Sequence, residues 1–113
     1  MADSCLFCRI VRGEIPATLV AESDTAVAFR DVNPQAPLHV LVIPKRHVAS
    51  LADADDAALV GELSLVAARI ARDAGYGESG FRTVVNTGPD AGQTVHHLHL
   101  HVLAGRSLDW PPG

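Results

Sequence analysis

The stretch Val95-His96-His97-Leu98-His99-Leu100-His101-Val102 alternates histidine with aliphatic residues over most of its length. In a β-strand, successive side chains point to opposite faces of the sheet, and each residue advances the chain by ~3.3 Å. We therefore predict a strand over residues 95–103, with His97, His99 and His101 on one face. The aliphatic side chains on the other face should pack against the core, while the histidine face should line a cleft or meet solvent.

The residues alone leave three explanations of the histidine face open. Exposed strand faces usually mix Thr, Lys, Glu and Ser. An ordinary solvent-exposed face is therefore the least favoured explanation of three alternating histidines. A strand pair of histidines can chelate zinc, but a third ligand must then come from elsewhere. Histidine can also act as nucleophile, acid or base near neutral pH. The preceding loop favours catalysis, because its glycines allow close approach and its polar groups can contact phosphate; these residues are Gly88, Gly92, Gln93 and Thr94.

Hydrophobic spacing and turn residues predict the elements outside this stretch. The longest apolar stripe, from Leu59 to Ala74, predicts a helix with Asp53 as N-cap and Gly75 just beyond its end. A short helix over residues 5–12 should be capped by Asp3 or Ser4. The remaining predicted elements are strands over residues 18–22, 26–30, 38–43 and 81–86.

Five strands, one long helix and hairpin-like connections predict an α+β domain with a mostly antiparallel sheet. The 113 residues, of which 48% are hydrophobic, form one domain over residues 1–113. The net charge of -4 argues against a polymeric nucleic acid as partner, because phosphate contacts need Lys and Arg. No apolar run approaches the ~20 residues of a membrane span, so neither a membrane partner nor a signal peptide is expected. We therefore expect a cytoplasmic protein.

The run His97-Leu98-His99-Leu100-His101-Val102-Leu103 resembles the motif of the histidine triad (HIT) superfamily. Further stretches over essentially the whole chain resemble its Hint branch: DVNPQAP at 31–37, VIPKRH at 42–47, GQTV at 92–95 and WPPG at 110–113. The resemblance implies a HIT-like fold with one long and one short helix, whose sheet continues across a homodimer. It also implies that the protein binds purine nucleoside monophosphates and hydrolyses the P–N bond of their phosphoramidates, releasing AMP and an amine.

The resemblance also implies roles for the histidines. His99 would attack the phosphorus and form a covalent nucleotidyl-histidine, which water then hydrolyses. His101 would bind the phosphate, and His97 and His47 would lie behind the nucleophile. Thr94 stands where the family usually has serine, and its hydroxyl would donate to the phosphate or to the departing amine.

Nucleotide contacts are implied in the same way. Asp31 would accept hydrogen bonds from the ribose hydroxyls, and Asn86 would contact the ribose and phosphate. Gly92 and Gln93 would lie along the phosphate. The base would lie between apolar walls, which stack on a base but discriminate little between bases; these walls are Leu6, Phe7, Ile10, Phe29 and Val32.

Some members of this family carry a structural zinc, and the matching residues here are Cys5, Cys8, His47 and His97. Sulfur and imidazole ligands suit tetrahedral zinc. A C-x-x-C pair alone does not separate a zinc site from free thiols, so both remain open. The chemistry itself requires no cofactor. His96 replaces an aromatic residue common at that position, and we expect it to be half-buried or at an interface.

Three other functions remain open beside the phosphoramidase. One is a nucleotide-binding regulatory or interaction module with negligible turnover. Another is a dinucleoside polyphosphate hydrolase, against which the terminal WPPG argues. The last is a hydrolytic zinc enzyme centred on the histidine strand, whose activity a chelator would abolish.

Overall fold

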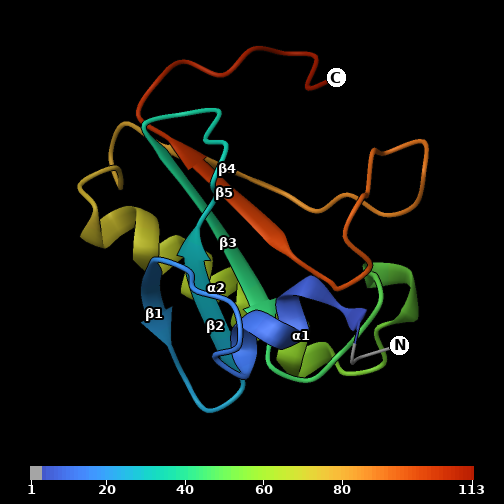
Figure 1. Ribbon diagram of the computed structural model, residues 1–113. Helices are drawn as coiled ribbons and strands as arrows, with labels where there is room; N and C mark the ends of the chain where they lie inside the picture. The colour runs from blue at the N-terminus through green and yellow to red at the C-terminus, as the bar shows by residue number, and fades with distance from the viewer. Residues whose placement is uncertain (1–3) are drawn as a thin grey trace.

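The computed structural model describes residues 4–113. Its five strands form one antiparallel sheet in the order β1-β2-β3-β5-β4, and the two α-helices pack on opposite faces of the sheet (Figure 1). The predicted α+β class and five-stranded sheet are confirmed. The elements are α1 (Leu6–Val11), β1 (Leu19–Glu22), β2 (Ala26–Arg30), β3 (Leu38–Pro44), the 3-10 turn η2 (Leu51–Asp53), α2 (Ala57–Asp73), β4 (Phe81–Val84) and β5 (Leu100–Ala104).

Strand β3 forms the centre of the sheet between β2 and β5. All seven of its residues are buried, which explains why its sequence, LHVLVIP, is almost continuously apolar. Its even-numbered apolar residues pack toward α2, whereas Leu41 and Ile43 pack toward α1. The sheet therefore carries a different core on each face.

The larger core lies between the sheet and α2, and its members include Val40, Val42, Leu63, Ala67 and Val102. Leu98, Leu100 and Val102 all belong to it, so the predicted core side of the histidine stretch is confirmed. The smaller core lies under α1. His97 and His99 face this second side, where both rings contact Phe7 of α1.

Both helices begin at residues other than the predicted ones. The N-cap of α2 is Asp56, whose carboxylate accepts from the Leu59 amide at 3.2 Å, and not Asp53. Asp53 lies in η2 and accepts a hydrogen bond from the Ser50 hydroxyl. The N-cap of α1 is Cys5 instead of Ser4, while Asp3 lies outside the described residues.

The last strand is shorter than predicted, because β5 begins only at Leu100. Residues 95–99 leave the ladder, and the Leu98 amide donates to the Val48 carbonyl at 2.6 Å instead of to a neighbouring strand. The buried Gln93 side chain fixes the preceding loop, since its amide donates to the Ala49 and Val95 carbonyls. His97 and His99 therefore lie on a non-strand approach to β5. Over residues 4–113, no helix combines the length and apolarity required to cross a membrane.

Candidate active site

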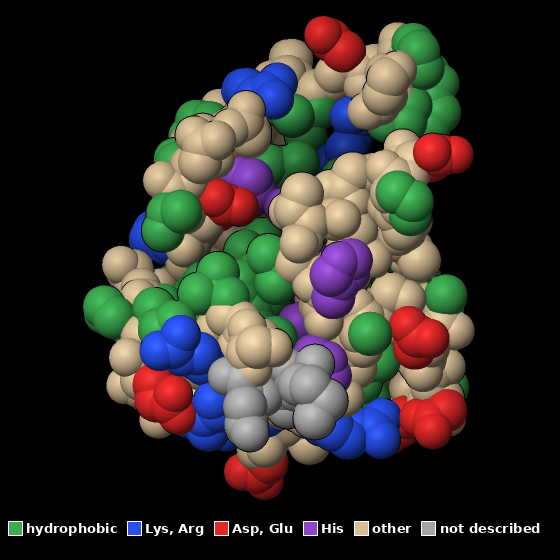
Figure 2. Space-filling view, turned by 45° about the vertical axis from the view of Figure 1, so that its right-hand side comes forward, with side chains coloured by type: hydrophobic (Ala, Val, Ile, Leu, Met, Phe, Trp, Pro, Cys, Tyr) green, Lys and Arg blue, Asp and Glu red, His purple; other side chains and the backbone are tan. Residues whose placement is uncertain are grey.

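A cavity of about 370 Å³ lies on the α1 side of the sheet and reaches both His99 and His101. Figure 2 shows a hydrophobic depression on one face of the molecule, with histidine and acidic side chains at its rim. The cavity brings together most of the predicted nucleotide-contacting residues. Its lining includes Leu6, Phe7, Ile10, Phe29, Val32, Asp31, Asn86, Gly92, Thr94, His99 and His101.

His99 is held by both of its neighbours in this cavity. Its Nδ1 lies 2.7 Å from the His97 carbonyl oxygen. A carbonyl only accepts, so Nδ1 carries the proton and donates, which leaves the lone pair on Nε2. The Phe7 ring packs edge-on against the imidazole at 5.2 Å and fixes its plane. In the neutral form of this buried ring, Nε2 is thus the one nucleophilic nitrogen.

His101 is held by a residue to which the sequence assigned no role. His39 in β3 places its Nε2 2.9 Å from Nδ1 of His101 in the neighbouring strand β5. The Gln35 amide donates to Nδ1 of His39 at 3.0 Å, so the proton of His39 must lie on Nε2. His39 therefore donates to His101, which keeps its own proton on Nε2. Diagonal cross-strand pairing, a tertiary property, makes this contact.

Asp31 lies at the rim of the same cavity, just after β2. Its Oδ1 accepts from the Asn33 amide at 2.8 Å, and its Oδ2 lies 3.4 Å from Nε2 of His39. Asp31, His39 and His101 bring three potential metal ligands together. The protonated Nε2 of His39 has no lone pair for a metal, so we assign this group to hydrogen bonding.

Burial favours the neutral form of two imidazoles beside the cavity, those of His101 and His39. Desolvation, with smaller contributions from His99 and His39, lowers the pKa of His101 to about 4 although Asp31 opposes the shift. Burial also lowers the pKa of His39, again against Asp31. His39 and His101 therefore add no fixed positive charge to the cavity near neutral pH.

The remaining predicted ligands gather in a buried cluster behind His99. Nδ1 of His97 lies 3.3 Å from Sγ of Cys5, 3.5 Å from Sγ of Cys8 and 3.3 Å from Nδ1 of His47. Its Nε2 donates to the Pro44 carbonyl at 2.8 Å, which leaves the lone pair on Nδ1. His97 is fully buried, so the expectation that it faces a cleft or solvent is wrong.

This Cys/His cluster fits a tetrahedral zinc ion. Two sulfur and two imidazole nitrogen atoms lie within 4.8 Å of one another, and the free lone pair of His97 points among them. Sulfur and nitrogen in this number form the usual structural zinc set. Without a metal, burial and the neighbouring Cys5 raise the pKa of the Cys8 thiol to about 11.

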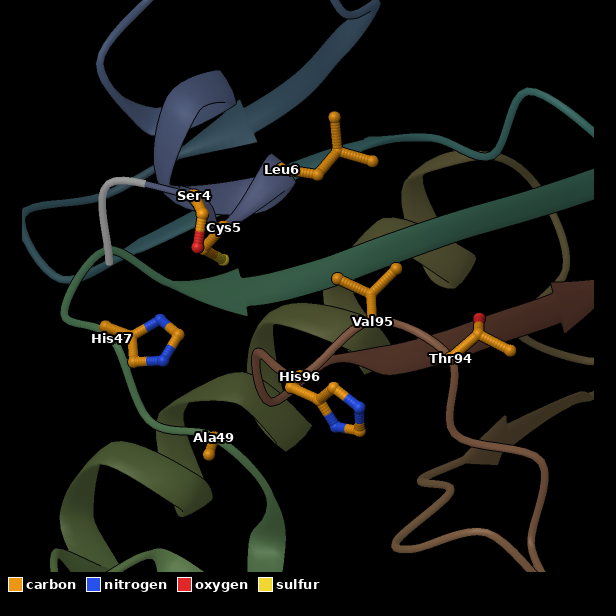
Figure 3. A pocket seen from close by; sticks show the side chains of 8 residues that line it. All are labelled: Ser4, Cys5, Leu6, His47, Ala49, Thr94, Val95 and His96. Carbon is orange, nitrogen blue, oxygen red and sulfur yellow. The ribbon is translucent and has the colours of Figure 1, made fainter. Parts of the chain in front are cut away.

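A second cavity of about 420 Å³ adjoins the first but reaches neither His99 nor His101 (Figure 3). Cys5 and His47 of the Cys/His cluster line it, together with the exposed His96. Leu6, Thr94 and Val95 line both cavities and so form the boundary between them. His96 is exposed within this chain, so the half-buried alternative is wrong, and a place at an interface stays a prediction.

Two residues predicted to contact the nucleotide, Gln93 and Val32, do not form the walls of the cavity. The Gln93 amide also accepts from the Gly88 amide at 2.9 Å, so this buried side chain braces the loop and does not line the cavity. Val32 lines the cavity but is fully exposed at its rim, so it is no packed wall. A motif gives the position of a residue in the chain. Whether the side chains of Gln93 and Val32 point into the cavity depends on how their loops fold.

Known proteins resemble the chain over almost its entire length. The HIT domain family matches residues 12–108. An uncharacterized HIT-like protein of Synechococcus elongatus is 56% identical, with all of both chains covered. The crystal structure of a HIT family hydrolase from Legionella pneumophila superposes with a TM-score of 0.95 at 47% identity and covers 97% of this chain and 100% of its own.

A more distant structure retains the same fold. The histidine triad nucleotide-binding protein from Candida albicans has a TM-score of 0.84 at 32% identity, covering 96% of this chain and 83% of its own. The alternating histidines, the five-stranded antiparallel sheet and a family match over residues 12–108 agree with one another. The chain therefore belongs to the HIT domain family.

Proposed function

We propose that this protein hydrolyses the P–N bond of purine nucleoside 5′-phosphoramidates through a covalent nucleotidyl-histidine on His99. The observation that carries the proposal is the 2.7 Å hydrogen bond between Nδ1 of His99 and the His97 carbonyl. This bond fixes the tautomer of the neutral ring, so that its lone pair lies on Nε2 in a cavity large enough for a nucleotide. The names of the similar proteins, a hydrolase and a nucleotide-binding protein, support the same assignment.

In the first step, the Nε2 lone pair of His99 attacks the phosphorus. The P–N bond breaks, and its electron pair leaves with the amine, which takes up a proton from solvent. Thr94 lines the cavity beside His99, and its hydroxyl supplies a hydrogen bond to the phosphate or to the departing amine. The His97 carbonyl stabilises the positive charge that the imidazole gains, because it accepts from the Nδ1 proton.

In the second step, a water molecule attacks the phosphorus of the nucleotidyl-histidine. The electron pair of the P–N bond to His99 returns to Nε2, and the proton of the water leaves to solvent. His101 donates its Nε2 proton to a phosphate oxygen in both steps, because His39 occupies its Nδ1. Histidine suits this chemistry because it is a nucleophile when neutral and a good leaving group once bonded to phosphorus.

The rest of the cavity holds the nucleoside. Asp31 accepts from the ribose hydroxyls, Asn86 contacts the ribose and phosphate, and the apolar residues of α1 and β2 stack on the base. The residues that wall the apolar end are aliphatic or phenyl side chains, which recognise the shape of a base more than its polar edge. The purine part of the proposal therefore rests on the family resemblance and not on these walls.

We further propose that zinc binds Cys5, Cys8, His47 and His97 as a structural ion. Bound there, it joins the start of α1 to the loop before β5, and the hydrolysis does not require it. His97 is then a ligand and positions His99 only through its main-chain carbonyl. Two unbridged thiols in the structure suit a reducing cytoplasm, where we place the protein.

We also propose a homodimer in which the sheet continues from one chain to the other. In support, β4 is an edge of the sheet and exposes Phe81, and the tail exposes Trp110 to 81%. Sedimentation velocity should give twice the chain mass of 11.9 kDa. A monomer at micromolar concentration would contradict this part of the proposal.

The covalent intermediate gives the direct test of the reaction. We expect an AMP–amine substrate, quenched after mixing, to leave one nucleotidyl group on the intact protein by mass spectrometry. The H99G variant should show no adduct and lose at least a factor of about 10³ in kcat, because it lacks the nucleophile. H96Q is the matched control, because His96 is an exposed histidine outside this cavity.

Each competing function predicts a different result. Equal turnover by H99G would disprove the nucleophile, and tight AMP binding without product would identify a binding module. Faster cleavage of diadenosine triphosphate than of the phosphoramidate would identify a polyphosphate hydrolase. Complete loss of activity with a chelator, in a protein that stays folded, would identify zinc chemistry.

A further inference from the structure

We propose that Cys5 and Cys8 form a reversible disulfide with small disulfide molecules, and that this modification controls how firmly His99 is held. The cysteine chemistry is independent of the reaction proposed above, and only its effect on turnover rests on that function. The ligand class is a low-molecular-weight disulfide such as oxidised glutathione. The site is the Cys/His cluster where it meets the second cavity.

The two cysteines are positioned to join. Cys5 is the N-cap of α1 in an extended conformation, so its Sγ lies over the first helical turn and accepts from the Cys8 amide at 3.4 Å. Both sulfur atoms also lie within 3.5 Å of the same atom, Nδ1 of His97. The C-x-x-C spacing at the start of a helix is that of redox-active disulfides.

Only one of the two buried cysteines lines the second cavity. Cys5 lines this cavity of about 420 Å³, and Cys8 does not (Figure 3). The volume falls within the ~300–1,000 Å³ of sites that hold small molecules. His47 lies beside Cys5 in the lining of this cavity. Cys5 is therefore the thiol that reacts first, and Cys8 the one that resolves.

The exchange balances without a further reagent. The Cys5 sulfur attacks one sulfur of the small disulfide R–S–S–R, its proton passes to the expelled R–S⁻, and a mixed disulfide forms. The Cys8 sulfur then attacks Sγ of Cys5, loses its proton to the second R–S⁻ and closes the Cys5–Cys8 bond. The two cysteines lose two electrons in total, and the small disulfide is reduced to two thiols.

Oxidation changes the hydrogen bonds of His97. The thiols are S–H donors beside Nδ1 of His97, whereas a disulfide has no hydrogen to donate. His97 is fully buried, and its Nε2 and carbonyl are already bonded to Pro44 and His99. Oxidation leaves Nδ1 of His47, at 3.3 Å, as the donor to this buried acceptor, so His97 must shift towards His47. Because its carbonyl holds His99, the shift loosens the nucleophile.

The same sulfur atoms would bind zinc, so a disulfide and a zinc ion exclude each other. A metal-bound thiolate has its lone pair engaged and reacts more slowly with a disulfide. Zinc should therefore raise the concentration of oxidant needed to form the Cys5–Cys8 bond. An unchanged oxidation midpoint with saturating zinc would show that zinc binds elsewhere.

The full-length protein, as purified, tests the disulfide. It is equilibrated over a range of ratios of reduced to oxidised glutathione, and the remaining thiols are blocked with an alkylating reagent. We expect both alkylation sites to disappear together, with an intact mass lower by two hydrogen atoms, and dithiothreitol to restore both. Alkylation of both cysteines at every ratio would overturn the proposal.

Two variants test the order of reaction. C8A should trap glutathione on Cys5 as a stable mixed disulfide, because the resolving thiol is gone. C5A should leave Cys8 largely unmodified under the same conditions, because Cys8 does not line the cavity. Glutathione on Cys8 in C5A at the same rate would show that the second cavity is not the route.

Ring ¹⁵N chemical shifts of His99 test the coupling without any turnover. In the dithiol form they should report a single tautomer with its proton on Nδ1, and in the disulfide form a mixture. If the proposed reaction is also correct, kcat should fall about tenfold on oxidation, corresponding to the loss of one well-formed hydrogen bond. Identical shifts and rates would overturn the coupling, whereas disulfide formation in a protein without phosphoramidase activity would refute only the proposed function.

Discussion

At the residue scale, the least expected feature is the hydrogen-bond chain that runs from the Gln35 amide through His39 to His101. It gives His101 one defined donor, Nε2–H, without placing a positive charge in the cavity. His39 contacts no reacting atom in this arrangement and acts as a positioning residue. His39 matters because it fixes which nitrogen of His101 carries the proton. A motif of residue types does not specify proton positions.

A pair of variants tests this positioning role. We expect H39L to lower kcat of the phosphoramidase reaction about tenfold, because His101 then loses the donor that fixes its proton on Nε2. H39Q keeps an N–H donor near the same place and should restore much of the loss. Steady-state kcat and KM, with H96Q as control, separate this role from binding. Equal losses in H39L and H39Q would indicate a packing defect instead.

At the element scale, the two neighbouring aspartates at the start of α2 have different roles. Asp56 caps the helix by accepting from the Leu59 amide, and Asp55 pairs with Arg46 on the surface at 3.2 Å. D56A should therefore destabilise the protein by about 1 kcal/mol, the usual cost of losing an N-cap. Urea unfolding monitored by circular dichroism gives this number.

D55A is the matched control for the cap. The Asp55 side chain is 81% exposed, and an exposed ion pair contributes little to stability. A loss in D55A equal to that in D56A would mean that both aspartates act through the general charge at the helix start. The capping hydrogen bond would then have no separate effect.

Hydrophobic patterns predicted elements well where a single face or a whole strand is buried. The run LHVLVIP reads as a buried strand because β3 is covered on both sides, and the stripe of α2 reads as a helix because only one side is covered. The predicted start of the last strand, residue 95, was wrong for a physical reason. Histidine and leucine alternate from residue 97, but the Leu98 amide bonds to Val48, so pairing with β3 begins only at Leu100.

At the scale of the whole molecule, the buried imidazoles link stability to pH. The pKa of His101 is about 4 in the folded protein against an ordinary 6.5, and that of His39 is also lowered. As the pH falls below 6.5, the unfolded chain therefore binds protons that the folded protein does not. Stability should be flat above about pH 7 and should decline from pH 6.5 towards 4.

Thermal unfolding over this pH range measures the effect. Each kcal/mol lost lowers Tm by roughly 4–8 °C in a domain of this size, so we expect a fall of several degrees. The groups facing His101 are His39, His99 and Asp31, and Asp31 partly offsets the loss. H101Q should flatten the decline, and an identical pH profile in that variant would assign the effect to other groups.

The sheet, the two helices, the core side of the histidine stretch and most residues that line the cavity beside His99 can be predicted from the sequence alone. These properties follow from hydrophobic periodicity and from a motif, both of which are local in the chain. Only the tertiary structure decided the tautomers of His97, His99 and His101, the part played by His39, the burial of His97 and the access to Cys5. Those properties depend on hydrogen bonds between residues as far apart as Cys5 and His97, which no spacing along the chain specifies.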